Sequence, residues 1–233
     1  MAKRGKLYKA NLAKVELTKR YSIDEALVVI DSFAPRKFDE SVEVAIRLGV
    51  DPKQSDQMVR GAAVLPHGLG KSVRVVAVVK GEAEKEAREA GADHVGCDEL
   101  IEKIEKGWLD FDRIITTPES LKDLTKIAKI LGPKGLMPNK KTGTVTSEIG
   151  KAVKEQKLGK VEYKVEKAGV VHAVFGKKSF GPNKLKENFS ALFENVLKQK
   201  PSTSKGVYIR KVAISTAMGP GLTLDTNLLE KTA

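Results

Sequence analysis

The sequence contains few of the residues on which disulfide-linked proteins, metal sites and base-stacking platforms depend. Cys97 is the only cysteine among 233 residues, which excludes an intramolecular disulfide and any multi-cysteine zinc site. The three histidines, His67, His94 and His172, have no metal-ligand spacing, so we expect neither a metal nor a cofactor. Aromatic residues make up only 5% of the chain, which argues against a surface that stacks many nucleic-acid bases.

Long apolar runs are also missing. No segment approaches the roughly 20 apolar residues of a membrane-spanning helix, and the lysine-rich start, residues 1–9, lacks the apolar core of a signal peptide. We therefore expect a cytoplasmic protein with no membrane partner. With 41% hydrophobic and 31% charged residues, the chain can bury an ordinary core.

The first part of the chain predicts a helix followed by a half-buried strand. The string Ser22-Ile-Asp-Glu25 is a capping box, and apolar residues at helical spacing continue to Phe33. Apolar side chains then alternate strictly with others, which puts them on one face of a strand: Val42, Val44, Ile46, Leu48 and Val50.

A similar pattern returns near the C-terminus. Alternation over residues 161–165, a turn ending at Gly169 and a second strand over 170–175 together predict a hairpin. A long amphipathic helix follows, with Asn183 as its expected cap and Pro201 as its stop, before a last strand over residues 207–216.

The middle of the chain has a different pattern of apolar residues. Near-continuous apolar runs at residues 73–79, 94–97 and 113–117 each precede a helical stretch, the last of them over 118–131. Strands buried on both faces and alternating with helices indicate a parallel sheet. The predicted fold is therefore α/β overall, a split α+β sandwich formed by both chain ends with an inserted Rossmann-like three-layer α/β domain.

Domain boundaries follow from this change of pattern. We predict an α+β domain from residues 1–67 plus 160–233, and an inserted domain over 68–159. The insertion contains 17 Lys and Arg against 15 Asp and Glu, whereas the ends contain 25 against 15. Most of the net charge of +12 therefore belongs to the terminal domain, and a polyanion is the natural partner for such a field.

Glycines mark both crossings between the predicted domains. These glycines, Gly68, Gly70 and Gly159, can act as hinges between the domains, or they can simply allow the chain to turn. The string ending in Gly70-Lys71-Ser72 imitates a phosphate loop, but Leu65 replaces its first glycine and the loop precedes a strand instead of opening a helix. We therefore expect no nucleotide hydrolysis and no enzyme.

An exposed loop is expected over residues 132–143, which combine glycines, prolines and lysines. Backbone N–H groups beside Lys134, Lys140 and Lys141 can hold phosphates as a secondary contact, although such loops are also common as simple chain reversals.

Three basic or flexible elements of the terminal domain are expected to meet on one edge. They are Arg36-Lys37-Phe38 before the first strand, residues 164–167 at the hairpin, and residues 217–221 after the last strand. Lysine and arginine bind RNA phosphates, an exposed ring stacks on a base, and glycine permits close backbone approach. Phe38 is the expected stacking ring, with a place in the core as its alternative.

Five strings are specific enough to carry a family resemblance. They are Ser55-Asp-Gln-Met-Val-Arg-Gly61, Leu65-Pro-His-Gly68, Leu131-Gly-Pro-Lys-Gly-Leu-Met-Pro-Asn139, Thr142-Gly-Thr-Val145 and Met218-Gly-Pro-Gly221. Over nearly its whole length the chain resembles the bacterial ribosomal protein L-one family, from the mobile side stalk of the large subunit.

The resemblance implies a split α+β domain that grips the stalk of the large-subunit ribosomal RNA, hinged to a Rossmann-like insertion. It also implies contact with deacylated transfer RNA at the exit site, and repression of the protein's own operon through its messenger RNA. Off the ribosome we expect a monomer. The RNA-contact positions carried over by matching motif are Lys37, Phe38, Ser41, Lys164, Glu166, Lys167, His172, Met218 and Gly219.

Three positions depart from the family pattern. Ala217 replaces the usual threonine, so a hydroxyl contact is lost or passes to Thr216. The hairpin reads Lys164-Val-Glu-Lys167 in place of Arg-Asn-Asp-Lys, which loses a bidentate guanidinium. Lys140 stands where proline is common.

The expected function is that of a structural ribosomal protein. The alternative is an RNA-binding repressor or chaperone that acts off the ribosome, and a third possibility is an enzyme whose site lies on the α/β insertion.

Overall fold

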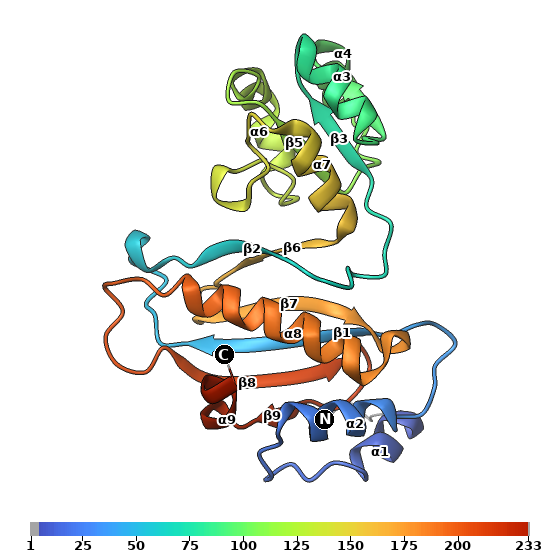
Figure 1. The fold of residues 1–233 in the computed structure, drawn as a ribbon, viewed down its shortest axis with the longest axis vertical. Coiled ribbons are helices and arrows are strands. Elements are labelled where there is room, and N and C mark those ends of the chain that lie inside the picture. Colours follow the sequence, from blue (N-terminus) through green and yellow to red (C-terminus); the bar gives the residue numbers. More distant parts are fainter. Residues whose placement is uncertain (1–4, 233) are drawn as a thin grey trace. The chain divides into compact units, whose positions relative to one another are not determined.

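The computed structural model describes residues 5–232, which fold into two compact units (Figure 1). Both chain ends, up to Gly70 and from Val161 onward, form one unit, here called the terminal unit. Lys71–Lys160 form the other, here called the middle unit. Strands and helices are mixed throughout, which confirms the α/β class.

A four-stranded antiparallel sheet is the frame of the terminal unit. Its order is β7-β1-β8-β9, and β1, which comes from the first part of the chain, is paired on both sides by strands from the last part (Figure 1). Side chains alternate between buried and exposed along β1 because successive residues of a strand point to opposite faces. The strands are β1 (Ser41–Leu48), β7 (Val170–Lys177), β8 (Ile209–Thr216) and β9 (Leu222–Leu224).

Two helices cover one face of this sheet. Figure 1 shows α8 (Gly181–Lys198) lying across the strands, and α2 (Ile23–Asp31) packs beside it. The predicted capping box of α2 is confirmed: the Ser22 hydroxyl accepts from the Glu25 amide, and the Glu25 carboxylate accepts from the Ser22 amide. The unit also contains the short helices α1 (Lys6–Leu12) and α9 (Thr226–Thr232).

The predicted hairpin is wrong in its pairing. Strand β6 (Lys160–Lys164) pairs with β2 (Arg60–Val64), a strand that the sequence did not reveal, and meets β7 only in a bridge between Val165 and Val171. The turn itself forms, because the Glu166 amide donates to the Val170 carbonyl at 2.9 Å. The Val165 amide instead donates to the Val59 carbonyl, so β6 continues along β2.

In the middle unit a parallel sheet of order β4-β3-β5 lies between two layers of helices. Its strands are β3 (Val75–Val78), β4 (His94–Gly96) and β5 (Arg113–Thr116). One face packs on α3 (Glu82–Glu89) and α7 (Ile149–Leu158). The other packs on α4 (Asp98–Glu105), α5 (Leu121–Leu124) and α6 (Ala128–Leu131).

The single helix predicted over residues 118–131 is interrupted. A 3₁₀ turn, Thr125–Ile127, separates α5 from α6, and the Thr125 hydroxyl donates to the Lys122 carbonyl three residues earlier. Such back-bonding by threonine competes with regular helix geometry. Of the helices in residues 5–232, none combines the length and the apolar character that a membrane crossing requires.

Candidate nucleic-acid interface

The second face of the four-stranded sheet carries mostly small, polar or charged side chains, and we call it the open face. Because the even-numbered residues of β1 are buried in the core, Ser41, Glu43, Ala45 and Arg47 point to the opposite side and are half-buried or exposed. The strand register brings β7 and β8 residues alongside them. The neighbours on this face are His172, Val174, Lys177, Lys211, Ala213 and Ser215.

One end of the open face gathers the predicted contacts around Phe38. Arg36, Lys37 and Phe38 come directly before β1, and Met218 follows β8, whose Thr216 pairs with Val42. The side chains of Phe38 and Met218 are 56% and 54% exposed. A place in the core for Phe38 is therefore excluded, and the ring is free to stack on a partner.

The opposite end of the sheet holds the turn with Lys164, Glu166 and Lys167. Strand β7 runs antiparallel to β1 and pairs Val170 with Arg47, so this turn lies about 20 Å along the strands from Ser41, at roughly 3.3 Å per residue. The expectation that all three basic elements meet on one edge is therefore wrong. His172, opposite Ala45 and exposed, lies between the two ends, with its Nε2 3.8 Å from a Glu166 oxygen.

A buried carboxylate, which the sequence did not single out, holds the loop after β8. Glu40 is 2% exposed, and its Oε1 accepts from the Met218 amide at 3.0 Å and from the Thr216 hydroxyl at 3.4 Å. Arg36 donates from Nη2 to the Met218 carbonyl at 3.4 Å, and its Nε lies 4.0 Å from the same Glu40 oxygen. These contacts fix the backbone that presents the Met218 side chain.

Thr216 has a supporting position in this arrangement. Its side chain is 2% exposed and turned toward Glu40, so its hydroxyl fixes the loop from within and does not face solvent. Ala217 is exposed, and its amide donates to the Ser41 carbonyl at 3.0 Å. A contact between Thr216 and RNA stays a prediction that would require this side chain to turn outward.

Gly219 is required by the tightness of the same loop. Its amide donates to the Thr216 carbonyl at 3.1 Å, which closes a turn. A β-carbon at this position would collide with the Thr216 hydroxyl oxygen and lie 3.2 Å from the Phe33 ring. Glycine therefore allows the chain to pass close to Phe33. The close approach of this backbone to RNA, which the sequence suggested, stays a prediction.

Lys177 is a second residue of the site that sequence reasoning missed. Its Nζ donates to the Ser41 hydroxyl at 3.0 Å and to the Asp39 carbonyl at 3.3 Å. The ammonium group therefore lies beside Ser41, one of the predicted RNA contacts, and adds a positive charge to the Phe38 end. Its place at the end of β7, opposite Ser41 in the register, could not be read without knowing the strand pairing.

Each of the three predicted hinge glycines has a positive φ, which is sufficient reason for glycine. Gly159 (φ 104°) ends α7, and Gly70 has φ 68°. Gly68 (φ 65°) is held in the terminal unit, because its carbonyl accepts from the buried Asn188 amide at 3.0 Å. Motion about these residues stays a prediction.

The loop over residues 132–143 of the middle unit presents three lysines on a backbone that is fixed by hydrogen bonds. Lys134, Lys140 and Lys141 are exposed. Beneath them the buried Thr144 hydroxyl accepts from the Asn139 amide at 2.8 Å and lies 3.0 Å from the Thr142 hydroxyl. A phosphate contact by these lysines stays a prediction.

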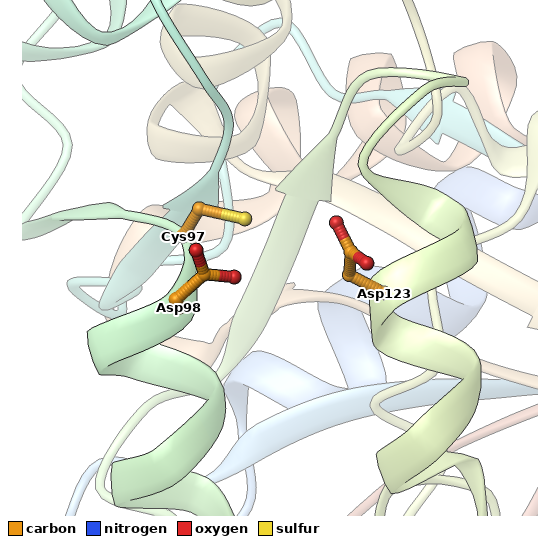
Figure 2. Close-up of side chains that lie close together, drawn as sticks. All are labelled: Cys97, Asp98 and Asp123. Atoms are coloured by element: carbon orange, nitrogen blue, oxygen red, sulfur yellow. The ribbon is translucent and has the colours of Figure 1, made fainter.

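One further cluster in the middle unit could be mistaken for a metal site. Cys97 and Asp98 lie at the start of α4 and face Asp123 of α5 (Figure 2), with ligand atoms within 4.8 Å of one another. Lys80 donates to Asp123 at 2.8 Å, and this contact lowers the pKa of that carboxyl. Burial raises the pKa of the Cys97 thiol, so the thiolate that a metal needs is disfavoured. We assign no metal to this cluster.

Comparison with known proteins identifies the family of the chain. The model of the Ribosomal protein L1p/L10e family matches residues 30–220. A protein from Solidesulfovibrio magneticus named large ribosomal subunit protein uL1 is 55% identical over 231 residues, covering 99% of this chain and 98% of the relative. The protein of the same name from Bdellovibrio bacteriovorus is 54% identical over 223 residues, covering 96% and 95%. The chain therefore belongs to the Ribosomal protein L1p/L10e family, which is a family of ribosomal proteins and not of enzymes.

Proposed function

We propose that this chain is a structural constituent of the large ribosomal subunit that binds the large-subunit ribosomal RNA at the mobile side stalk. The observation that carries the proposal is the open sheet face, with Phe38 and Met218 exposed at one end and basic side chains at both ends. Family membership and the printed names of both relatives support the ribosomal assignment.

The chemistry of the Phe38 end suits an RNA segment with an unpaired base. The exposed ring would stack on the base, while Lys37 and Lys177 lie where phosphates would follow. The Ser41 hydroxyl and the tight Met218-Gly219 turn would let a sugar or phosphate approach the backbone.

The other end would hold a second segment of the same RNA. Lys164 and Lys167 are exposed there, and His172 lies between the two ends. A separation of about 20 Å along the strands spans several nucleotides, so the face suits a folded RNA better than a single base. Small side chains in the middle, such as Ala45 and Ala213, leave room for the RNA backbone.

The proposal includes the division of labour between the two parts of the chain. Residues 1–67 plus 160–233 would act as a split α+β sandwich domain that binds RNA, and residues 68–159 as an inserted Rossmann-like domain. The compact units and the concentration of positive charge in the terminal part support this division. The parallel order β4-β3-β5 and its two helix layers support the Rossmann-like description.

Two further roles belong to the same proposal. The protein would assist release of deacylated transfer RNA from the exit site, and it would repress its own operon by binding messenger RNA. The resemblance of the chain supports both roles, and a single RNA-binding face supports competition between the messenger and the ribosomal RNA. A repressor or chaperone that acts only off the ribosome is the alternative, because it would use the same face.

Co-sedimentation tests the ribosomal role. The chain is mixed with large subunits from a bacterium that lacks its own copy of this protein, and the subunits are pelleted. We expect the chain in the pellet, and an excess of stalk-RNA transcript should return it to the supernatant. If the chain binds the transcript but not the subunits, the off-ribosome alternative replaces the proposal; if it binds neither, RNA binding at this face is refuted.

A further inference from the structure

A cleft of about 570 Å³ opens in the terminal unit beside the Met218 loop. Its volume lies within the roughly 300–1,000 Å³ that is usual for small-ligand pockets. One wall comes from the start of α1, a segment that neither the sequence motifs nor the proposed RNA contacts include. The lining residues are Gly5, Lys6, Leu7, Tyr8, Arg36 and Met218.

The lining combines apolar surface with positive charge. Leu7 and Met218 are 43% and 54% exposed, and Tyr8 contributes a half-buried aromatic ring. Lys6 is an exposed cation of the lining and Arg36 is a second, mostly buried one, and no carboxylate is among the lining residues that the structure describes. A flat apolar ring attached to an anion matches this chemistry, because a ring packs on tyrosine and methionine while the anion pairs with the cations. A nucleotide has both parts.

The cleft is continuous with the Phe38 end of the open face. Arg36 and Met218 belong to both, because Arg36 donates to the Met218 carbonyl and Glu40 holds the Met218 amide. An RNA strand seated at Phe38 therefore has a neighbouring nucleotide position one loop away. The wall between them is fixed by hydrogen bonds, so the cleft is preorganised on this side.

We propose that the cleft binds one unpaired nucleotide of the RNA, with its base against Tyr8 and Met218 and its phosphate near Lys6. This inference rests on the proposed RNA-binding function and extends the interface to α1. The occupant is part of a bound RNA, because the cleft shares Arg36 and Met218 with the Phe38 end of the open face, and the exposed Lys37 follows Arg36 directly. Free mononucleotides are the competing occupants.

Affinity of the full chain for a stalk-RNA transcript tests the cleft. Tyr8→Ala should weaken binding about tenfold, the loss expected when one stacked base loses its ring. Tyr8→Phe keeps the ring and should bind like the parent chain. Lys6→Ala should weaken binding more than Lys9→Ala, which removes an exposed charge from the same helix outside the cleft. Thermal unfolding of each variant should match that of the parent chain.

Transcripts with one abasic position each then identify the nucleotide. At the inserted nucleotide, removal of the base should weaken binding to the parent chain about tenfold and leave binding to Tyr8→Ala unchanged. Parent-like affinity of a folded Tyr8→Ala variant would overturn the cleft while leaving RNA binding intact. The cleft would also be overturned if, at every abasic position, removal of the base weakened binding to Tyr8→Ala as much as it weakened binding to the parent chain. If the parent chain itself fails to bind the transcript, the proposed function falls and the cleft falls with it.

Discussion

At the scale of single residues, the site depends on groups that are buried behind it. Phe38 and Met218 face solvent, but the loop that presents Met218 is held by Glu40, which is 2% exposed. Its sequence context, directly before an alternating strand and four residues after Arg36, gave no sign of burial. Burial of Glu40 arises because β8 pairs with β1 and brings Thr216 over it, which only the long-range fold determines.

Removing the Glu40 carboxylate should loosen this loop. Glu40→Ala leaves the Met218 amide and the Thr216 hydroxyl without their acceptor, so we expect RNA affinity to fall by about 1–3 kcal/mol. Glu40→Gln retains an acceptor oxygen and should lose less. Asp31→Ala, an exposed acid at the end of α2, is the control for a change of charge. Equal affinity of Glu40→Ala and Asp31→Ala for the stalk transcript would refute the supporting role.

The two glycines of the loop offer a matched pair. A β-carbon at Gly219 would collide with Thr216, whereas one at Gly221 meets nothing within 4 Å. Gly219→Ala should therefore displace the turn and weaken binding about tenfold, while Gly221→Ala should leave it within about twofold. Filter binding of both variants measures the difference. The close-packing argument fails if Gly221→Ala is the more damaging change.

At the scale of elements, the sequence indicated individual helices and strands, but it did not indicate which strands pair with one another. The Ser22–Glu25 capping box of α2 lies within four residues of sequence, and the structure contains it as predicted. Alternation over residues 161–165 indicated a strand correctly, but its partner is β2, whose Gly61 and two alanines carry a weak strand signal. Helix α8 begins at Gly181, not at Asn183, because proline is favoured in a first helical turn.

The buried side-chain amide of Asn188 should contribute much of the stability with which α8 is held against the rest of the terminal unit. Asn188 is fully buried, accepts from the His67 amide, and donates to the carbonyls of Gly68 and Phe175. Asn188→Ala leaves these backbone groups unpaired, so we expect a loss of about 2–4 kcal/mol in the free energy of unfolding. The control is Asn183→Ala, exposed on the same helix, which should change stability by less than about 0.5 kcal/mol. Urea unfolding of both variants measures the difference in stability. Similar midpoints for Asn188→Ala and Asn183→Ala would contradict the stabilising role of Asn188.

At the scale of the whole molecule, charge and pattern indicated which parts of the chain act together. The excess of lysine and arginine outside residues 68–159 pointed to the chain ends, and the four-stranded sheet is built from those ends. The expected single edge was wrong because antiparallel pairing puts the start of β7 beside the end of β1. An antiparallel register of this kind depends on contacts between residues more than a hundred positions apart.

Deletion of the middle unit tests the division of labour. A chain of residues 1–67 joined to 160–233 should keep its RNA affinity within about tenfold, or 1.4 kcal/mol, because the open face and its cations lie in the terminal part. Circular dichroism must first establish that this shortened chain folds. A larger loss from a folded protein would show that the middle unit binds RNA directly.

The central claim, that the open face binds RNA through Phe38, is tested most directly by one comparison in the full chain. Val28 on α2 is 62% exposed and belongs to a helix that covers the opposite face of the sheet, so Val28→Ala is the matched control for loss of an exposed apolar side chain. Affinity for the stalk transcript should fall by about 1–3 kcal/mol in Phe38→Ala and stay unchanged in Val28→Ala. Parent-like affinity of a folded Phe38→Ala variant would contradict the account.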